Sequence, residues 1–561
     1  MPRSLHTPAV LSSPSTKKVA SFLDSVAKAY GDGAKTESIV SSIVSGSNDF
    51  SAPDNLAEVL TSAPTERRQS LLDSVTLGIQ RYTEAHGKPP TADVVEAALQ
   101  QGHDAMFHSV SKDGQILDSV ATGDASEPTS LQPNRAVVAT LMAISEAIPF
   151  AGYLPADIKS NESKLAIVSH IAGSTYGDYK EGDSFNGIGL GQVFASSSRM
   201  VRLPLTGANP LKGAFTATND PADPGYCLPG GTAVPVLAKR TIIYVNGIPA
   251  AFDKGDGAGS NTAISGGVTI GGVDYTIAGT VSPDTGVVEL TSVSPAFPAG
   301  TVVNAQGFVN YEKRPALMPS LILRAKTYQL FANPWRIETH ISIDADGQIR
   351  NELGIDPISS ALMAVRNQAS AERHYNALEM MHAVGKGLQA PDYNLDFTGR
   401  SQQMNRGQMW VDLRTELGTL DQQMAVRTMD HGITHIYADA RLCANFASMP
   451  SEFFKPSGVT PRAGIYRVGR MFDLYDLYYT PKKLYQAADG SEADMLCIGR
   501  SGDVARNPVL LGDAVAPTFM DLALDGSLQR KAALYARDYT CVNPHAPSAT
   551  GAVLMRVKGL R

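Results

Sequence analysis

The chain has 561 residues, a hydrophobic content of 43%, a charged content of 18% and a formal net charge of −7. A negative balance argues against a surface built mainly to bind nucleic acid, which needs a basic face. The length predicts two to four structural units, and a charged content below the usual value of about 25% indicates that much of the surface faces protein.

Signals for export, membrane insertion or disulfide bonding are weak. The N-terminal sequence lacks the apolar core of a signal peptide. No run of about 18 apolar residues occurs, so we expect no membrane span. The cysteines stand far apart without a CxxC pair, which predicts reduced, buried thiols in a protein made in a reducing cytoplasm. They are Cys227, Cys443, Cys497 and Cys541.

The first 110 residues are predicted to be helical, with candidate helices over 16–30, 65–86 and 91–101. They fit an ordinary small helical domain or a detachable assembly module. Residues 111–133 are polar and indicate a linker. An apolar helix over 136–148 and a strand over 164–176 follow. The helix over 65–86 places its apolar residues on one side: Leu71, Leu72, Val75, Ile79 and Tyr82.

Residues 187–312 change character, because glycine, threonine and valine rise and helix signals vanish. Turns are expected at Asn246-Gly247 and at 284–286. Val273, Tyr275 and Ile277 alternate as a half-buried strand does. The pattern predicts an inserted β domain or a greatly extended β loop. Its strands are expected over 240–253, 268–281, 286–293 and 301–310.

A strand over 321–343 precedes the longest predicted helix. Asp356 can cap this helix, Pro357 suits its first position, and Gly385 and Gly387 stop it. At about 1.5 Å per residue it is a rod of roughly 40 Å, which can touch different neighbours at its two ends. Its expected buried rows are Ile358, Leu362, Val365 and Ala369, and then Ala371, Tyr375 and Leu378.

A second helix is predicted over 407–430, followed by a strand over 433–438 and a short helix capped by Asp439. Residues 463–561 read mainly as short strands and loops. The chain therefore predicts an α+β fold, with helices beside mixed or antiparallel strands. The helix over 407–430 repeats its apolar residues on one face: Leu413, Leu417, Leu420 and Met424.

Two histidines have a metal-like spacing. His431 and His435 stand four residues apart, but Gly432 lies between them and the segment reads as a helix end followed by a strand. That spacing converges only on a helix, so a structural role is favoured. Glu372 and His374 lie close together on the long helix without a nucleophile nearby, and we expect them to be interface or solvent charges.

Two glycine-rich stretches are also weak candidates for a site. Residues 187–191 lack a complete GxGxxG pattern, which favours a flexible turn. Residues 253–261 could hold calcium loosely but lack the closing glutamate of an EF-hand, which favours a hairpin loop. We therefore predict no catalytic, cofactor-binding or metal-binding residue, and no enzymatic activity.

Three stretches and a closing segment carry a resemblance to a known family. The first, AVVATLMAISEAIPFAGYLPAD with KLAIVSHIAGSTYG, spans 136–177, and the second spans 321–385. The third combines GITHIYADARLCANFASM and ADMLCIGRSGDVARNPVLLGDAVAPTFM, and RDYTCVNPHAP closes the series. In order and spacing they resemble the major capsid protein of tailed bacteriophages, with the HK-97 fold, and more narrowly the T-even myovirus type.

The resemblance covers most of residues 130–561, apart from the insertion at 187–312. It implies an HK-97-like fold with five regions. These are a scaffold-like or assembly segment (1–110), a linker and N-arm (111–176), an E-loop with the inserted β domain (177–330), a peripheral domain with a spine helix at 356–385 (331–430 and 521–561), and an axial domain (431–520).

The resemblance also implies a structural homo-oligomer. Hexamers, or pentamers, would form the icosahedral head shell of a virion around its dsDNA genome, without sequence-specific binding to DNA. Expected partners are other copies of the chain and scaffold, portal, vertex or decoration proteins, with no membrane. Assembly is expected in the host bacterial cytoplasm.

Two other functions stay open. One is a β-rich phage or bacterial adhesin that binds carbohydrate. The other is a glycan hydrolase, which needs a cleft with two carboxylates about 5–9.5 Å apart.

Overall fold

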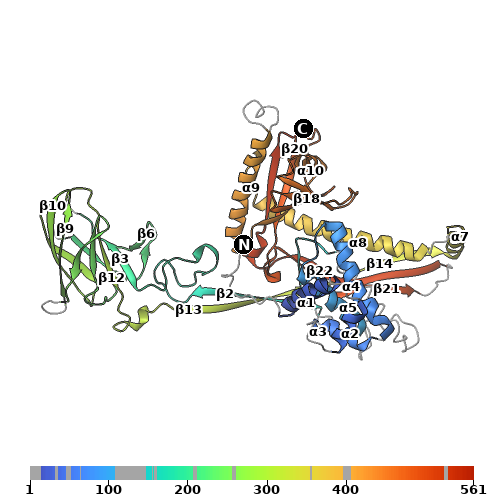
Figure 1. Cartoon of the computed structure of the whole chain (residues 1–561), viewed down its shortest axis with the longest axis horizontal. Helices are drawn as coiled ribbons and strands as arrows, with labels where there is room; N and C mark the ends of the chain where they lie inside the picture. The colour runs from blue at the N-terminus through green and yellow to red at the C-terminus, as the bar shows by residue number, and fades with distance from the viewer. Residues whose placement is uncertain are drawn as a thin grey trace. The chain divides into compact units, whose positions relative to one another are not determined.

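The computed structural model divides into two compact units. Unit 1 is Met1–Ile167 with Thr327–Arg561, and unit 2 is Val168–Lys326. Helices and sheets both occur in unit 1 and strands dominate unit 2 (Figure 1), so the chain is mixed α and β, as its sequence predicts. The structure describes residues 14–31, 36–45, 52–63, 65–107, 147–154, 156, 161–205, 211–255, 261–353, 357–395, 406–522 and 529–560.

The N-terminal part of unit 1 is a helical region with its own apolar core. Phe22, Leu60, Leu72 and Val95, from four different helices, are each at most 1% exposed. The sequence predicts only three of the helices, because the two nine-residue helices are too short to show a clear period. The helices are α1 Pro14–Gly31, α2 Thr36–Val44, α3 Asp54–Ser62, α4 Thr65–His86 and α5 Ala92–Phe107.

The linker predicted over 111–133 lies outside the described residues, and so does most of the helix predicted over 136–148. Only its last two residues, 147 and 148, are described, and they are not helical. The chain continues in unit 1 with the short strand β1, Gly152–Tyr153.

Unit 1 contains a four-stranded sheet with the order β1-β21-β22-β14. The pairing of β1 with β21 is parallel, and the other pairings are antiparallel. The single strand predicted over 321–343 is interrupted at Ala332, and only its second half belongs to this sheet. The long strands are β14 Asn333–Ser342, β21 Val509–Leu522 and β22 Gln529–Val542.

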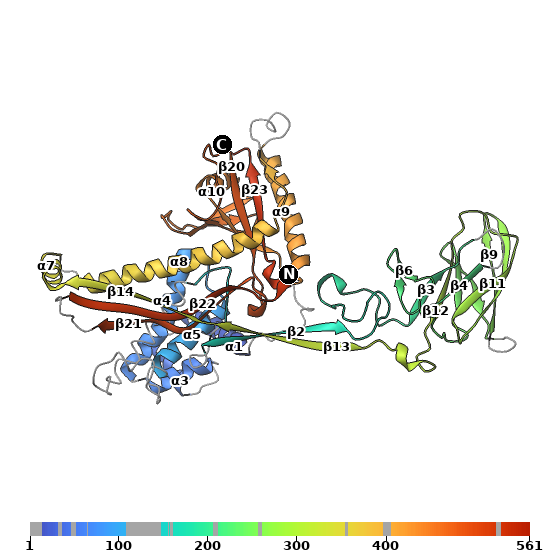
Figure 2. The same cartoon turned by 180° about the vertical axis from the view of Figure 1, so that it is seen from behind.

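A short helix, α7 Ile343–Leu353, precedes the long helix α8, Pro357–Gly387. The prediction places the start and the end of α8 correctly, but it does not include α7. One part of α8 contacts β22 and β14, as Figure 2 also shows, and another part contacts the strands of a second sheet. The proposed cap Asp356 lies outside the described residues.

The predicted buried face of α8 is only partly correct. Ala377, Leu378 and Met381, in its second half, are at most 2% exposed. Val365 and Ala369 are only half-buried, and Ala371 is exposed; nothing is described of the Ile358 and Leu362 side chains. A helix of 31 residues is longer than the core that a single subunit offers, so its first half keeps apolar surface uncovered.

The second sheet of unit 1 has seven strands in the order β15-β23-β20-β16-β19-β18-β17. Helix α9, Arg406–Thr428, buries its predicted apolar face against it, and helix α10, Ala440–Ala447, is capped by the Asp439 carboxylate as predicted. The strands are β15 Tyr393–Asn394, β16 Ile433–Ala438, β17 Phe454–Pro456, β18 Tyr466–Met471, β19 Tyr475–Tyr479, β20 Glu492–Gly499 and β23 Ala552–Lys558.

The sheet pairing differs from the predicted region boundaries. Strand β21 falls within the predicted axial region 431–520 over most of its length, yet it pairs with β22 in the four-stranded sheet. Conversely, α9, β15 and β23 fall in the predicted peripheral region but pack with the seven-stranded sheet. The chain leaves this sheet after β20 and returns at β23, and boundaries read along the sequence cannot show such a return.

Unit 2 is built on an eight-stranded sheet with the order β3-β12-β7-β8-β9-β10-β11-β4, beside a small hairpin of β5 and β6. The turns at Asn246-Gly247 and 284–286 form as predicted. The strand predicted over 268–281 is in fact two strands that turn at Gly271 and Gly272, both with positive φ. The strands are β3 Ser198–Arg202, β4 Leu211–Ala214, β5 Asn219–Asp220, β6 Asp223–Cys227, β7 Ile242–Val245, β8 Ile248–Asp253, β9 Thr262–Ile270, β10 Val273–Val281, β11 Val287–Ser294 and β12 Val303–Phe308.

A two-stranded ribbon is formed by β2, Glu162–Ala172, and β13, Leu321–Phe331. At one end the Ala332 N–H donates to the Asn161 carbonyl (2.9 Å), and at the other the Gly173 N–H donates to the Ser320 carbonyl (2.7 Å). The two strands therefore run antiparallel, with the excursion of unit 2 between them in the sequence.

Candidate functional site

The two histidines with metal-like spacing lie in different surroundings. His431 lies before β16 and its Nδ1 is 3.4 Å from the Asp430 carboxylate, whereas His435 lies within β16 with its Nε2 3.3 Å from the Lys88 Nζ. Both imidazoles are buried. No group of three or more histidine, cysteine or carboxylate side chains suited to a metal ion occurs among the residues that the structure describes.

The two glycine-rich stretches, residues 187–191 and 253–261, contribute to the backbone structure of unit 2 where they are described. Residues Gly187–Gly189 form a short 3-10 turn. The Asp253 carboxylate accepts hydrogen bonds from the backbone N–H groups of Lys239 (2.6 Å) and Gly255 (2.9 Å), so it stabilises a hairpin end. Residues 256–260 of the proposed calcium loop lie outside the described residues.

The prediction for Glu372 and His374 is correct for only one of them. Glu372 is exposed, but the His374 ring turns inward and its Nε2 lies 3.2 Å from the Tyr437 hydroxyl. Burial lowers the pKa of His374 to about 3, so the imidazole is neutral at ordinary pH. It is a packing and hydrogen-bonding group rather than a solvent charge.

A shallow concavity on the outer side of α9 contains no carboxylate, and its lining is uncharged apart from Arg427. No described helix has both the length and the apolar content needed to cross a membrane.

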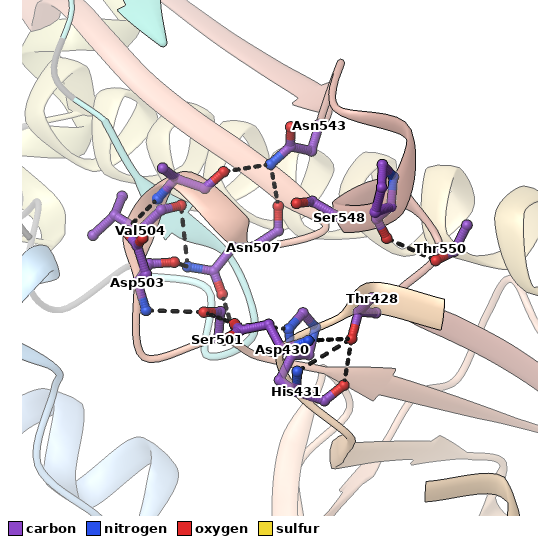
Figure 3. A network of polar contacts seen from close by, with 12 residues as sticks. Thr428, Asp430, His431, Ser501, Asp503, Val504, Asn507, Asn543, Ser548 and Thr550 are labelled. Atoms are coloured by element: carbon purple, nitrogen blue, oxygen red, sulfur yellow. Dashed lines mark hydrogen bonds and ion pairs between the residues drawn. The ribbon is translucent and has the colours of Figure 1, made fainter. Parts of the chain in front are cut away.

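A buried polar network joins the two sheets of unit 1 (Figure 3). The Asn543 amide donates to the carbonyls of Ala505 and Asn507, both at 2.8 Å, and its Oδ1 accepts from the His545 N–H at 2.9 Å. The Asn507 Oδ1 accepts from the Ser501 N–H at 3.0 Å. Both asparagines are at most 2% exposed. The two asparagine side chains therefore take the place of water as hydrogen-bond partners of backbone groups in the loop that links β20 to β21.

The same network contains serine, histidine and aspartate, but not in an arrangement that activates a nucleophile. The Ser501 hydroxyl donates to the Asp430 carboxylate, not to an imidazole. The His431 ring lies against the backbone of Gly499 and Gly551, and its Nε2 has no hydrogen-bond partner among the described residues. A catalytic triad needs the imidazole between the hydroxyl and the carboxylate, so this cluster has a structural role.

Two carboxylates face each other across β21 and β22. Asp513 and Asp538 are directly paired in the sheet, and Arg373 of α8 reaches both, at 2.8 Å and 3.8 Å. The Trp335 indole N–H also donates to Asp538 at 3.2 Å. Burial raises the pKa of Asp538. Because the guanidinium lies against both acids, the cluster anchors α8 to the sheet rather than offering a pair of acid–base groups to a substrate.

Ion pairs also attach the N-terminal helices to the rest of unit 1. The Asp476 carboxylate of β19 pairs with Arg467 at 2.6 Å and with Lys88, which follows α4. Burial acts to raise the pKa of Asp476, but the two cations hold it below its usual value. At the start of α5, Asp93 pairs with Arg500 at 2.8 Å.

Apolar side chains of the ribbon are exposed. Leu321, Ile322 and Leu323 at the start of β13 are 53%, 48% and 64% exposed, and Phe331 at its end is 58% exposed. Isolated apolar residues on a surface are ordinary, but a contiguous run on an extended strand is typical of an interaction surface. We call Leu321, Ile322 and Leu323 the ribbon patch.

Sequence reasoning missed Asn507 and Asn543, and it missed the contacts of Arg373. Asn507-Pro508 and Asn543-Pro544 are Asn-Pro pairs, which mark turns and could have identified the two loops that meet. The carbonyls that accept from the Asn543 amide lie far away in the sequence, and Arg373 resembles any other charge on a helix.

No protein-family model matches the sequence, and no curated protein matches it. Several solved structures are similar to parts of the chain, at low sequence identity. The jumbo bacteriophage PhiKZ capsid has 10% identity and a TM-score of 0.36, covering 73% of this chain and 92% of that one. The capsid of Ralstonia phage GP4 has 10% identity and a TM-score of 0.28, covering 54% and 84%.

An encapsulin complex from Synechococcus elongatus has 10% identity and a TM-score of 0.25, covering 43% of this chain and 79% of that one. TM-scores below 0.5 do not by themselves establish a shared fold.

Replacing Asn543 with leucine keeps the branched shape of the side chain but leaves two carbonyls and one N–H without this partner. We expect Asn543→Leu to lower the free energy of unfolding by about 2–4 kcal/mol. Denaturant titration followed by tryptophan fluorescence measures this loss. The control is Asn376→Leu at an exposed position of α8, where we expect less than about 0.5 kcal/mol. An equal effect of both variants would contradict the role of Asn543.

Replacing Asp476 with asparagine leaves the buried Arg467 and the partly exposed Lys88 without their carboxylate, and we expect Asp476→Asn to destabilise the chain by about 3–5 kcal/mol. Asp473→Asn on the same hairpin removes an exposed partner of Lys455 and should have little effect. Because the folded pKa of Asp476 lies below 3.8, its contribution is present above that pH and is lost on further acidification. Denaturant titrations at several pH values measure both effects, and equal losses in the two variants would contradict this.

Proposed function

We propose that the chain is the major capsid protein of a tailed bacteriophage and that its copies assemble into the head shell. The observation that carries the proposal is the order of elements around the ribbon. Strand β2 leaves unit 1, the chain forms an all-β unit, and β13 returns beside β2 shortly before the 31-residue helix α8. The sequence resemblance implies this order of an E-loop followed by a spine helix.

The surface supports assembly. The ribbon patch is exposed, the first half of α8 keeps half-buried apolar positions, and most residues of β14 are exposed. Such surfaces are stable in water when other copies of the chain cover them. The net charge of −7 suits a shell that encloses DNA without gripping it.

The finer assignments rest on the sequence motifs. We assign α8 as the spine helix. The peripheral domain is then α8 with the sheet of β14, β21 and β22, and the axial domain is the seven-stranded sheet with α9 and α10. Hexamers and pentamers of these subunits would close the icosahedral shell with scaffold, portal, vertex or decoration partners. The likeness to the T-even type depends on the same motifs.

The two alternatives have less support. A carbohydrate-binding adhesin would use unit 2, but nothing in the described geometry of that unit favours a sugar. A glycan hydrolase would use a carboxylate pair in a cleft, and Asp513 and Asp538 instead lie against Arg373.

Electron microscopy of the purified chain tests the proposal. We expect closed shells, tubes or hexameric rings from the native sequence. Changing Leu321, Ile322 and Leu323 together to serine should leave the subunit folded by circular dichroism but reduce assembly at least tenfold, because the ribbon patch loses its apolar contacts.

The matched control changes Leu190, Ile248 and Val273 to serine, which are 58%, 55% and 46% exposed in unit 2, and we expect it to assemble normally. A native chain that stays a monodisperse monomer or trimer and binds glycans would favour the adhesin. Equal assembly of both triple variants would contradict the role of the ribbon patch.

We also propose that the β domain of unit 2 braces neighbouring capsomers. A deletion of 240–310 alone would remove β11 and β12, the partners of β4 and β3, and so leave an incomplete sheet. The chain offers a cleaner excision, because the Ser320 N–H donates to the Ser174 hydroxyl at 3.0 Å. Residues 175–319 can therefore be replaced by Asn-Gly, which turns the ribbon into a hairpin.

We expect the excised chain to fold and to form shells that release their contents at a lower temperature than native shells, because the bracing contacts are gone. Heating shells and measuring the release of a packaged dye or DNA gives this temperature. Shells of normal heat resistance would overturn the bracing role without affecting the capsid proposal.

A further inference from the structure

Three histidines, of which His86 and His435 are buried and His374 is half-buried, lie where the N-terminal helices meet the seven-stranded sheet and α8. His86 is at the end of α4, His374 is on α8 and His435 is in β16. Their rings surround a stacked pair of tyrosines, Tyr437 and Tyr478, whose centroids are 5.1 Å apart. The distances from the imidazoles to these rings are 5.9 Å for His86, 6.0 Å for His374 and 5.8 Å for His435. We call these five residues the histidine seam.

The seam already carries more positive than negative charge. Lys88 lies 3.3 Å from the His435 imidazole, and it shares Asp476 with Arg467, whose side chain also donates to the Gly87 carbonyl. The described charged groups that act on the imidazoles and on the neighbouring Tyr82 comprise four cations and two carboxylates: Lys88, Arg462, Arg467, Arg500, Asp93 and Asp476.

Protonation is therefore unfavourable while the helices are docked. Burial lowers the pKa of His86 and of His374 to about 3, and it lowers the pKa of His435 well below 6.5; nearby cations act in the same direction. When the seam opens, water reaches the rings and their pKa values return to about 6.5. A state that binds protons more readily gains population as the pH falls.

We propose that the histidine seam is an acid-sensitive latch, which holds the helices of residues 14–107 on the seven-stranded sheet while the imidazoles are neutral and releases them when the imidazoles take up protons. Lys88 and His86, at the end of α4, contact Asp476, His435 and Tyr478 of the seven-stranded sheet. Each of the three imidazoles belongs to a different element. The latch is a property of the single subunit and does not depend on its role in a shell.

The sign and the size of the effect follow from the three rings. Above about pH 6.5 the imidazoles are neutral in both states, so they do not oppose docking of the N-terminal helices. Below it, each imidazole shifts the equilibrium toward release by about tenfold per pH unit until the docked pKa is reached. Three imidazoles predict about a thousandfold shift per unit between pH 5.5 and 4.5.

Hydrogen–deuterium exchange of the full chain, corrected for the intrinsic pH dependence of exchange, tests the latch. Peptides covering 71–99 and 475–479 should open with the predicted steep pH dependence, while peptides of α9 and of β10 in unit 2 stay protected. A shift below tenfold per unit in the native chain would overturn the proposal. Opening of all four regions at the same pH and with the same slope would also overturn it, because that result describes global acid unfolding.

The double variant His86→Phe with His374→Phe keeps two aromatic rings in the seam but removes two titrating groups. Only His435 then remains, and the shift should fall to about tenfold per pH unit. The control His340→Gln, at an exposed position of β14, should keep the native slope. A double variant with the native slope would overturn the latch, and if this variant fails to fold, the slope of the native chain decides.

Discussion

The subunit depends on how α8 is fixed in place. Its Arg373 guanidinium lies between two carboxylates of neighbouring strands, and its second half buries Ala377, Leu378 and Met381. A buried charge without a partner is strongly unfavourable, so the helix cannot slide along the sheet without losing this arrangement. The same helix contacts strands of both sheets of unit 1. One rod thus determines the relative position of the sheets, and the first half of its length is left for other contacts.

Local signals in the sequence predicted those elements that depend on neighbouring residues. The bounds of α4 and β16 agree with the prediction, the Asp439 cap is present, and Pro357 begins α8 where a helix start was expected. Short helices such as α2 and α7 were missed because they have too few turns for a period to emerge. The Gly271-Gly272 turn was missed because the strands on both sides read as one run.

Contacts between distant segments could not be predicted. Arg373 meets Asp513 across 140 positions of sequence, and nothing near either residue marks the pairing. The same holds for Asn543 in Figure 3, whose amide donates to carbonyls that lie 36 and 38 positions away in the sequence. In this network, buried polar groups join separate segments of the chain. Serine, histidine and aspartate therefore meet in one network without the geometry of a reaction centre. Composition alone could not have distinguished a structural network from a reaction centre.

The position of β23 has a consequence for synthesis of the chain. This strand lies between β15 and β20, inside the seven-stranded sheet, although it follows β20 by more than fifty residues. At a translation rate of about 5–20 residues per second, the apolar edge of β20 waits roughly 3–10 s for its partner. During this interval Leu496, Cys497 and Ile498 can pair with the edge of another nascent chain. The order of strands thus makes the interval before β23 emerges the period in which newly made chains are most prone to aggregate, and chaperones that cover strand edges would act then.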